Sequence, residues 1–126
     1  MITAVVLLLG RVLFAFVFLF TGLAHLAPKD PGVGYAKASG VPVPQLSVRL
    51  AGLLALTGGL SILFGFHARV GAWLLVLFLV PVTLAMHRYW HTAAAMQRVQ
   101  FVKNAALLGA ALMIANLGSG PLSLTR

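Results

Sequence analysis

Side chains able to bind a ligand stand near the ends of the apolar segments of this 126-residue chain. His25 ends the first segment, His87 and Trp90 follow the third, and Lys103 and Asn104 open the fourth. Imidazole, ammonium and amide groups donate hydrogen bonds, as a quinone carbonyl or a lipid head group requires. Aromatic rings supply an apolar wall for the same ligand. The pattern therefore predicts a ligand site where these segment ends meet, and Arg49, near the start of the second segment, is expected beside it.

An alternative interpretation of the same residues is a solvated rim of unrelated polar side chains at a membrane surface. A metal site is a further alternative, because His87 and His91 are four residues apart and can share one face of a helix. No third ligand of the usual kind is evident in the sequence, and a metal site needs at least three protein ligands. We therefore expect neither a metal ion nor haem.

Arg11 lies inside the first apolar segment, on the same predicted helix face as Ala15, Phe18 and His25. Two interpretations stay open. Arg11 either points into the protein and contributes to ligand binding, or extends its long side chain to the nearer membrane surface. A buried Arg11 needs a partner, and Asp30, the only acid, sits beyond the far end of the same segment. The partner is then a backbone carbonyl, a lipid phosphate, a ligand or an acid of another chain.

The elements that position these residues are apolar segments of membrane-spanning length. Hydrophobic residues form 61% of the chain and charged residues 8%, which is far from the composition of a soluble domain. A spanning helix needs roughly 20 apolar residues. The sequence predicts an all-α integral membrane four-helix bundle, a single domain over residues 1–126 with both termini on one side. The predicted spans are Ile2–Leu26, Ser47–Phe66, Val70–Met86 and Phe101–Leu117.

The connections between these spans differ in composition. The first loop contains several prolines and glycines that prevent a helix through it, whereas residues 88–100 contain neither and can continue as helix. The second span carries small residues along one stripe, which indicates either close helix packing or, as the minor alternative, a groove for a ligand. Those small residues are Ala51, Gly52, Ala55, Thr57, Gly58 and Gly59. Pro81 is expected to kink the third span before His87.

Charge and cysteine content exclude several classes of protein. The absence of cysteine excludes disulfides, thiol redox chemistry and cysteine-held iron–sulfur or zinc sites in this chain. The net charge of +8 comes from scattered basic residues, so no nucleic-acid partner is expected, and basic flanks facing anionic lipid explain the charge. Lysine and arginine are most frequent in the first and third loops, which predicts cytoplasmic loops and extracytoplasmic termini. Residues 1–26 are expected to be retained, because no basic residue precedes this long apolar segment.

Several short motifs along nearly the whole chain resemble the DoxX family of small four-helix membrane proteins. The Lys103-Asn104 pair and the histidine-aromatic end of the third span are the most specific of them. The motifs are Gly10-Arg11, Phe18-Leu19-Phe20-Thr21-Gly22-Leu23, Gly40-Val41-Pro42, Gly58-Gly59-Leu60, Gly65 with Arg69, His87-Arg88-Tyr89-Trp90, Lys103-Asn104-Ala105-Ala106-Leu107-Leu108-Gly109 and Leu117-Gly118-Ser119-Gly120-Pro121.

The resemblance implies a multi-pass protein of a bacterial or archaeal cytoplasmic membrane. It also implies a link to quinone-dependent oxidation of sulfur compounds or to membrane complexes of redox and oxidative-stress metabolism. This chain departs from the family pattern at Ala55, where relatives often carry glutamate, and at His25, where they often carry lysine. The missing glutamate removes a natural partner for Arg11 and a natural proton carrier.

These observations favour a quinone-associated subunit of a membrane redox system. Such a subunit could belong to a quinone-linked oxidoreductase, but this chain is not expected to be catalytic alone. The expected ligand is a quinone, and the expected partners are membrane lipid and either other membrane subunits or a second copy of the chain. Two alternatives stay open: a non-catalytic accessory or assembly subunit of a larger membrane complex, and a small carrier of lipids or metabolites.

Overall fold

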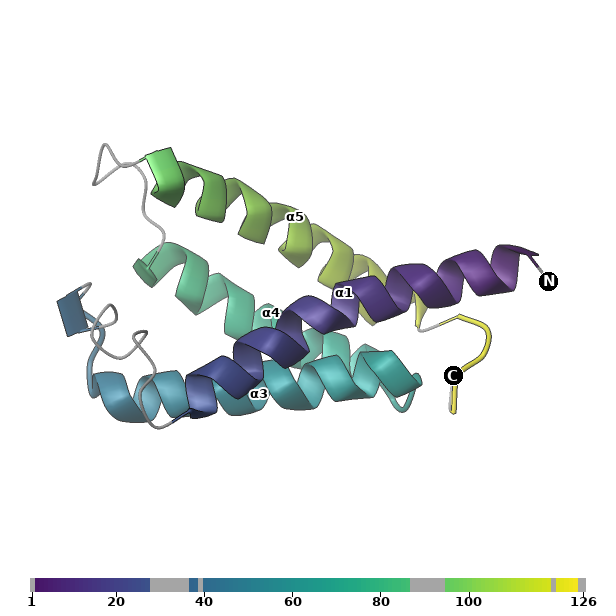
Figure 1. Ribbon diagram of the computed structural model, residues 1–126, viewed down its shortest axis with the longest axis horizontal. Coiled ribbons are helices and arrows are strands. Elements are labelled where there is room, and N and C mark those ends of the chain that lie inside the picture. The colour runs from purple at the N-terminus through teal and green to yellow at the C-terminus, as the bar shows by residue number, and fades with distance from the viewer. Residues whose placement is uncertain (1, 28–36, 39, 87–94, 119, 125–126) are drawn as a thin grey trace.

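Four long helices account for most of the chain in a computed structural model, which describes residues 2–27, 37–38, 40–86, 95–118 and 120–124 (Figure 1). They are α1 (Ile2–Leu26), α3 (Pro44–Phe64), α4 (Ala68–Met86) and α5 (Ala95–Leu117). The described residues contain no strand. The predicted all-α architecture is confirmed.

The helices differ from the predicted spans mainly at their starts. α3 begins at Pro44, because proline is tolerated in the first turn of a helix, where its missing N–H has no partner to lose. It ends at Phe64, since Gly65 adopts the left-handed conformation (φ 64°) that closes a helix. α5 begins at Ala95, so residues 95–100, which belong to the third-loop segment without proline or glycine, are helical. α4 continues through Pro81 to Met86.

Each helix packs on the next one along the chain: α1 on α3, α3 on α4, and α4 on α5. The core follows this order, with Phe18 of α1, Ile62 of α3 and Leu75 and Leu79 of α4 fully buried. α1 and α5 lie at the two edges of this arrangement, and in each of them only 17% of the most apolar window is buried. Most of their side chains are therefore left to contact lipid.

Glycines make the close helix contacts possible. A Cβ atom placed on Gly22 of α1 would lie 2.7 Å from the backbone nitrogen of Leu56 and 2.9 Å from the carbonyl oxygen of Gly52. On its other side, α3 meets α4 where a Cβ on Gly58 would lie 2.8 Å from the carbonyl oxygen of Gly71. The predicted stripe of small residues on α3 thus serves helix packing against both neighbours.

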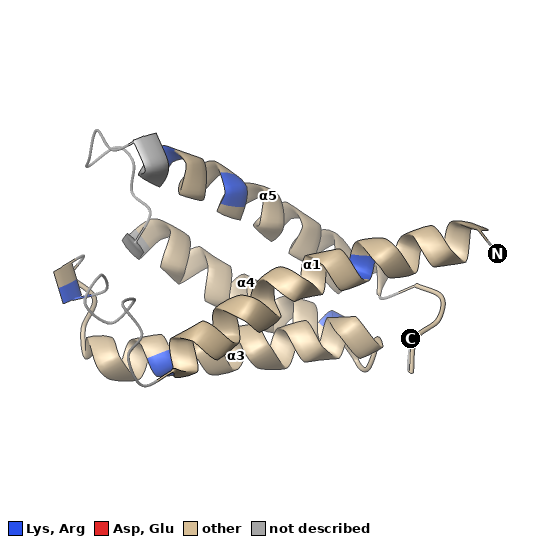
Figure 2. Cartoon of the chain, viewed as in Figure 1, with Lys and Arg blue, Asp and Glu red and all other residues tan. Residues whose placement is uncertain are grey.

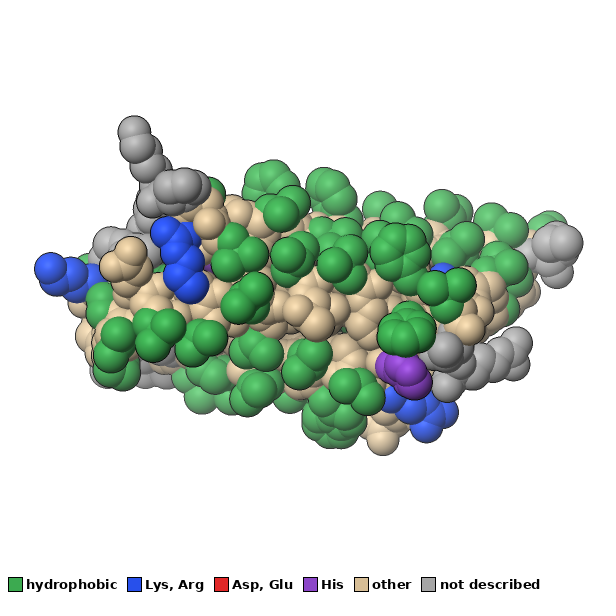
Figure 3. All heavy atoms as spheres, turned by 90° about the horizontal axis from the view of Figure 1, so that it is seen from below, with side chains coloured by type: hydrophobic (Ala, Val, Ile, Leu, Met, Phe, Trp, Pro, Cys, Tyr) green, Lys and Arg blue, Asp and Glu red, His purple; other side chains and the backbone are tan. Residues whose placement is uncertain are grey.

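The surface matches a membrane environment. α1, α3 and the Arg98–Leu117 part of α5 are each long and apolar enough to cross a membrane, and Ala68–Leu84 of α4 is a shorter apolar helix. Apolar side chains cover the middle of the face seen in Figure 3. Basic residues lie toward the two ends (Figure 2). We call the end with Arg49 and Lys103 the loop end. The opposite end, with residues 65–69 and 118–124, is the terminal end.

Candidate functional site

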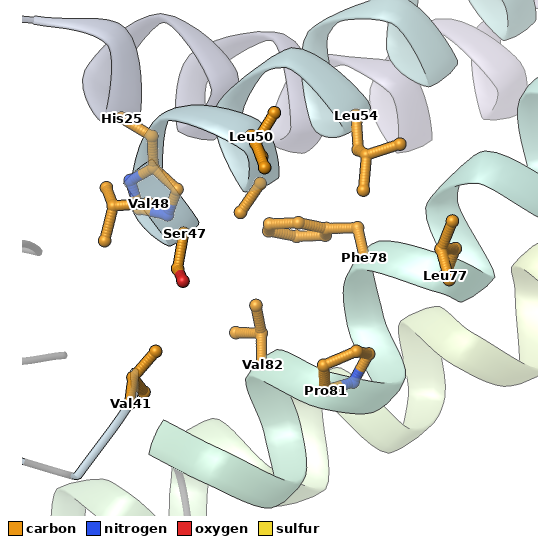
Figure 4. A pocket seen from close by; sticks show the side chains of 11 residues that line it. His25, Val41, Ser47, Val48, Leu50, Leu54, Leu77, Phe78, Pro81 and Val82 are labelled. Carbon is orange, nitrogen blue, oxygen red and sulfur yellow. The ribbon is translucent and has the colours of Figure 1, made fainter. Parts of the chain in front are cut away.

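A cavity of about 400 Å³ opens at the loop end between α1, α3 and α4 (Figure 4). We call it the loop-end cavity. Two polar side chains, His25 and Ser47, face it, and the other lining residues are apolar. Its described lining is His25, Val41, Ser47, Val48, Leu50, Ala51, Leu54, Leu77, Phe78, Pro81 and Val82. A large apolar wall with few polar groups is the usual composition of a site for a small organic ligand.

His25 reaches this cavity from the last turn of α1, because α3 carries a glycine beside it. A Cβ atom on Gly52 would lie 2.8 Å from the Cβ of His25, so any larger residue there would displace the histidine. The His25 ring lies 6.3 Å from the ring of Phe78, centroid to centroid, and Phe78 packs edge-on against Phe18. Aromatic packing thus holds the wall of the cavity against the core.

Ser47 faces the cavity near the start of α3, but its hydroxyl already donates a hydrogen bond to the preceding loop. Its Oγ donates a hydrogen bond of 2.7 Å to the carbonyl oxygen of Pro42. The hydroxyl oxygen keeps acceptor capacity, whereas its proton does not serve a ligand. His25 is therefore the described lining residue suited to donate a hydrogen bond into the cavity.

Arg49 fixes the end of α1 beneath this site. Its Nη1 donates to the carbonyl oxygen of His25 at 2.8 Å and to that of Ala27. The last carbonyls of a helix lack partners within the helix, and a cation there also complements the helix dipole. The structure thus ties Arg49, which the sequence placed among the ligand-binding residues, to the backbone that carries His25.

The other predicted site residues are distributed differently. Asn104 is only 5% exposed on α5, whereas its neighbour Lys103 is exposed, as consecutive residues of a helix point in different directions. Neither of them lines the loop-end cavity. His87 and Trp90, like His91, lie outside the described residues, so their part in a site stays a prediction.

Arg11 lies toward the terminal end and is only 6% exposed. Its Nη2 donates to the carbonyl oxygen of Leu122 at 2.7 Å, and its Nη1 donates to the carbonyl oxygen of Pro121 at 3.1 Å and to Oγ of Ser123 at 2.8 Å. We call this set of contacts the tail clasp. Backbone carbonyls, one of the partner types expected from the sequence, thus bind Arg11, and the cavity beside His25 does not include it.

The C-terminal tail is held at a second point as well. The backbone N–H of Leu124 donates to the carbonyl oxygen of Phe64, at the end of α3, at 3.1 Å. Gly118 and Gly120 have positive φ angles of 85° and 79°, which let the chain turn back after α5. The sequence predicted no contact for this segment. A buried arginine far from the only acid was the signal that could have pointed to the tail carbonyls.

The fold and the surface define a multi-pass integral membrane protein built from consecutive antiparallel helices with polar ends. The sequence profile of the DoxX family matches residues 6–88, from α1 past the end of α4, and the chain belongs to the DoxX family.

Two relatives from Escherichia coli strain K12 match almost the whole chain. The inner membrane protein YphA is 29% identical over 97% of this chain and 89% of its own length. The inner membrane protein YqjF is 32% identical over 94% of this chain and 88% of its own length. No solved structure matches the chain significantly. The protein is accordingly a multi-pass protein of the cytoplasmic, or inner, membrane.

Proposed function

We propose that this protein binds a quinone in the loop-end cavity and acts as the quinone-associated subunit of a membrane redox system. The observation that carries the proposal is the imidazole of His25 at the edge of a cavity between membrane helices whose lining is apolar apart from His25 and Ser47. The resemblance of the chain to DoxX proteins linked to quinone chemistry supports the same choice of ligand.

The cavity meets the main chemical needs of a quinone head group. Its volume of about 400 Å³ falls within the roughly 300–1,000 Å³ typical of small-molecule sites. Phe78, Val48 and Val82 offer apolar contact to a ring, and His25 offers a donor for one carbonyl oxygen.

The chain's own residues would bind and orient the ligand and exclude water. A bound quinone would supply the two-electron chemistry. The imidazole of His25 can donate a hydrogen bond to a carbonyl oxygen of the ligand. We propose that the electrons come from a partner protein, because a chain without cysteine has no thiol or cysteine-held iron–sulfur group to carry them. The protein is thus proposed as a subunit rather than as an enzyme by itself.

The test is quinone binding to purified protein in lipid nanodiscs, measured by titration with a short-chain ubiquinone analogue. We expect His25→Leu to weaken binding about five-fold, the loss of one hydrogen bond of about 1 kcal/mol. Ala51→Phe should abolish it by filling the cavity. The matched control is His67→Leu, an exposed histidine at the terminal end.

Wild-type affinity in both cavity variants, at wild-type thermal stability, would exclude this site. If all three variants, including the control, lose quinone binding, the cause is a general effect of histidine loss or of helix packing. That result would also contradict the proposal.

A further inference from the structure

A second cavity, of about 590 Å³, lies between α1 and α5 toward the terminal end, and the proposed function does not use it. We call it the edge groove. It follows from the packing order, because α1 and α5 stand at opposite edges of the bundle and each packs mainly on another helix. Its lining is Val6, Leu7, Gly10, Arg11, Phe14, Ala110, Met113, Ile114, Leu117, Gly118 and Gly120.

We propose that the edge groove binds an anionic phospholipid, with an acyl chain between α1 and α5 and the phosphate beside Arg69. The apolar part of the groove extends along α1 from Val6 to Phe14, a rise of about 12 Å at 1.5 Å per residue. Apolar side chains or glycine and alanine supply nearly all of the wall. The exception is Arg11, whose Nη atoms bind the tail, and the remaining apolar wall suits an acyl chain.

The charge at the mouth of the groove selects the head group. Gly118 lines the groove, and a Cβ atom placed on it would lie 3.2 Å from Nε of Arg69. The exposed side chain of Arg69 therefore lies next to a glycine of the groove wall, at the terminal end. Asp30, the only acid of the sequence, lies outside the described residues, which therefore contain no carboxylate side chain to neutralise Arg69. A phosphate is the complementary anion, because a guanidinium binds its oxygens with paired hydrogen bonds.

Two glycines provide a matched test of the acyl-chain site. A Cβ atom on Gly10 or on Gly109 would meet no atom within 4 Å, so both positions accept a large side chain without a clash in the protein. Gly10 lines the groove and Gly109 does not. Gly10→Phe should fill the groove, whereas Gly109→Phe should add the same side chain to the lipid-facing surface of α5.

The experiment is native mass spectrometry of the protein released from nanodiscs that contain phosphatidylglycerol and phosphatidylcholine. We expect one tightly retained phospholipid on the wild type and on Gly109→Phe, and its loss from Gly10→Phe. If Gly10→Phe and Gly109→Phe both keep the phospholipid, or both lose it, the proposed acyl-chain site is wrong. A retained quinone in place of the phospholipid would also overturn it.

The head-group part is tested by Arg69→Gln, with the exposed Arg98→Gln at the loop end as control. Arg69→Gln should reduce the preference for phosphatidylglycerol over phosphatidylcholine about five-fold, the usual contribution of one basic residue near a lipid surface. An unchanged preference in Arg69→Gln, or no preference in the wild type, would exclude the role of Arg69. These lipid measurements do not involve the loop-end cavity, so their outcome does not depend on whether the protein binds a quinone.

Discussion

Arg11 and Ser123 lie 112 residues apart in the sequence, and a 2.8 Å hydrogen bond from Nη1 to Oγ joins them. With the carbonyls of Pro121 and Leu122, this contact connects the first helix to the end of the chain. The α1 and α5 helices have few direct contacts with one another. The tail clasp therefore supplies a link between the two edges of the bundle that helix packing does not.

Arg11→Leu should destabilise the protein by about 2–4 kcal/mol, because it removes charge-assisted hydrogen bonds that are largely shielded from solvent. The tail should then detach, and carboxypeptidase should shorten the chain faster than in the wild type. Ser123→Ala, which removes one acceptor, should cost about 1 kcal/mol. Thermal unfolding in mild detergent measures both effects, with Arg98→Leu as an exposed control. A variant without Arg11 that unfolds at the wild-type temperature would refute the structural role of the clasp.

Gly22→Ala should destabilise the bundle by about 1–3 kcal/mol, the usual cost of overpacking a close contact. The added methyl group would lie 2.7 Å from the backbone of α3, which cannot move away without separating the helices. Gly109→Ala is the matched control, and it should be neutral or stabilise slightly because alanine favours a helix over glycine. The comparison is made by thermal unfolding. Equal effects of the two substitutions would show that α1 and α3 do not touch at Gly22.

Arg49→Gln should loosen the last turn of α1, because the His25 and Ala27 carbonyls lose their cationic donor. We expect a cost of about 1–2 kcal/mol and faster hydrogen exchange of the amides in residues 22–27 than in the wild type. Lys37→Gln, an exposed change at the same end, serves as control. Unchanged exchange at the end of α1 would mean that the capping contact does not form in the membrane.

The orientation can be tested by cysteine labelling, because the natural sequence has no cysteine. Leu124 is 71% exposed in the tail, and Ala38 is exposed in the first loop. If the basic loops face the cytoplasm, a membrane-impermeant maleimide on intact cells should label Leu124→Cys and should label Ala38→Cys only after permeabilisation. The reverse labelling pattern would show that the termini are cytoplasmic.

The sequence predicted the helices well because their signal is local. Long apolar segments and the proline-rich first loop each act on the residues beside them, whereas the helix end at Phe64 was missed because the predicted span ran through Gly65 to Phe66. The position of Pro44 was harder to predict, since proline either precedes a helix or occupies its first turn. The helical start at Ala95 was foreseen only as a possibility, because a polar surface helix and a loop have similar composition.

The sites were predicted less completely because they depend on contacts between distant segments. The sequence places His25 at the end of the first span, but it does not indicate that Phe78 and Leu54 form a cavity with His25. Helix periodicity places Arg11 and His25 on one face, yet the length of α1 separates them into different surroundings at its two ends. A buried arginine far from the only acid indicates a carbonyl partner, but the sequence does not indicate which carbonyls, since any residue provides one.

The tail clasp also has a consequence for biosynthesis. Each helix packs on the one synthesised just before it, so α1, α3, α4 and α5 can associate in the order in which they enter the membrane. Arg11 is inserted more than a hundred residues before Ser123 leaves the ribosome. Throughout that time its guanidinium must rely on water or lipid phosphate near the membrane surface. Closure of the clasp therefore requires synthesis to have passed Ser123, and a product that ends before Pro121 would keep an unshielded arginine in its first helix.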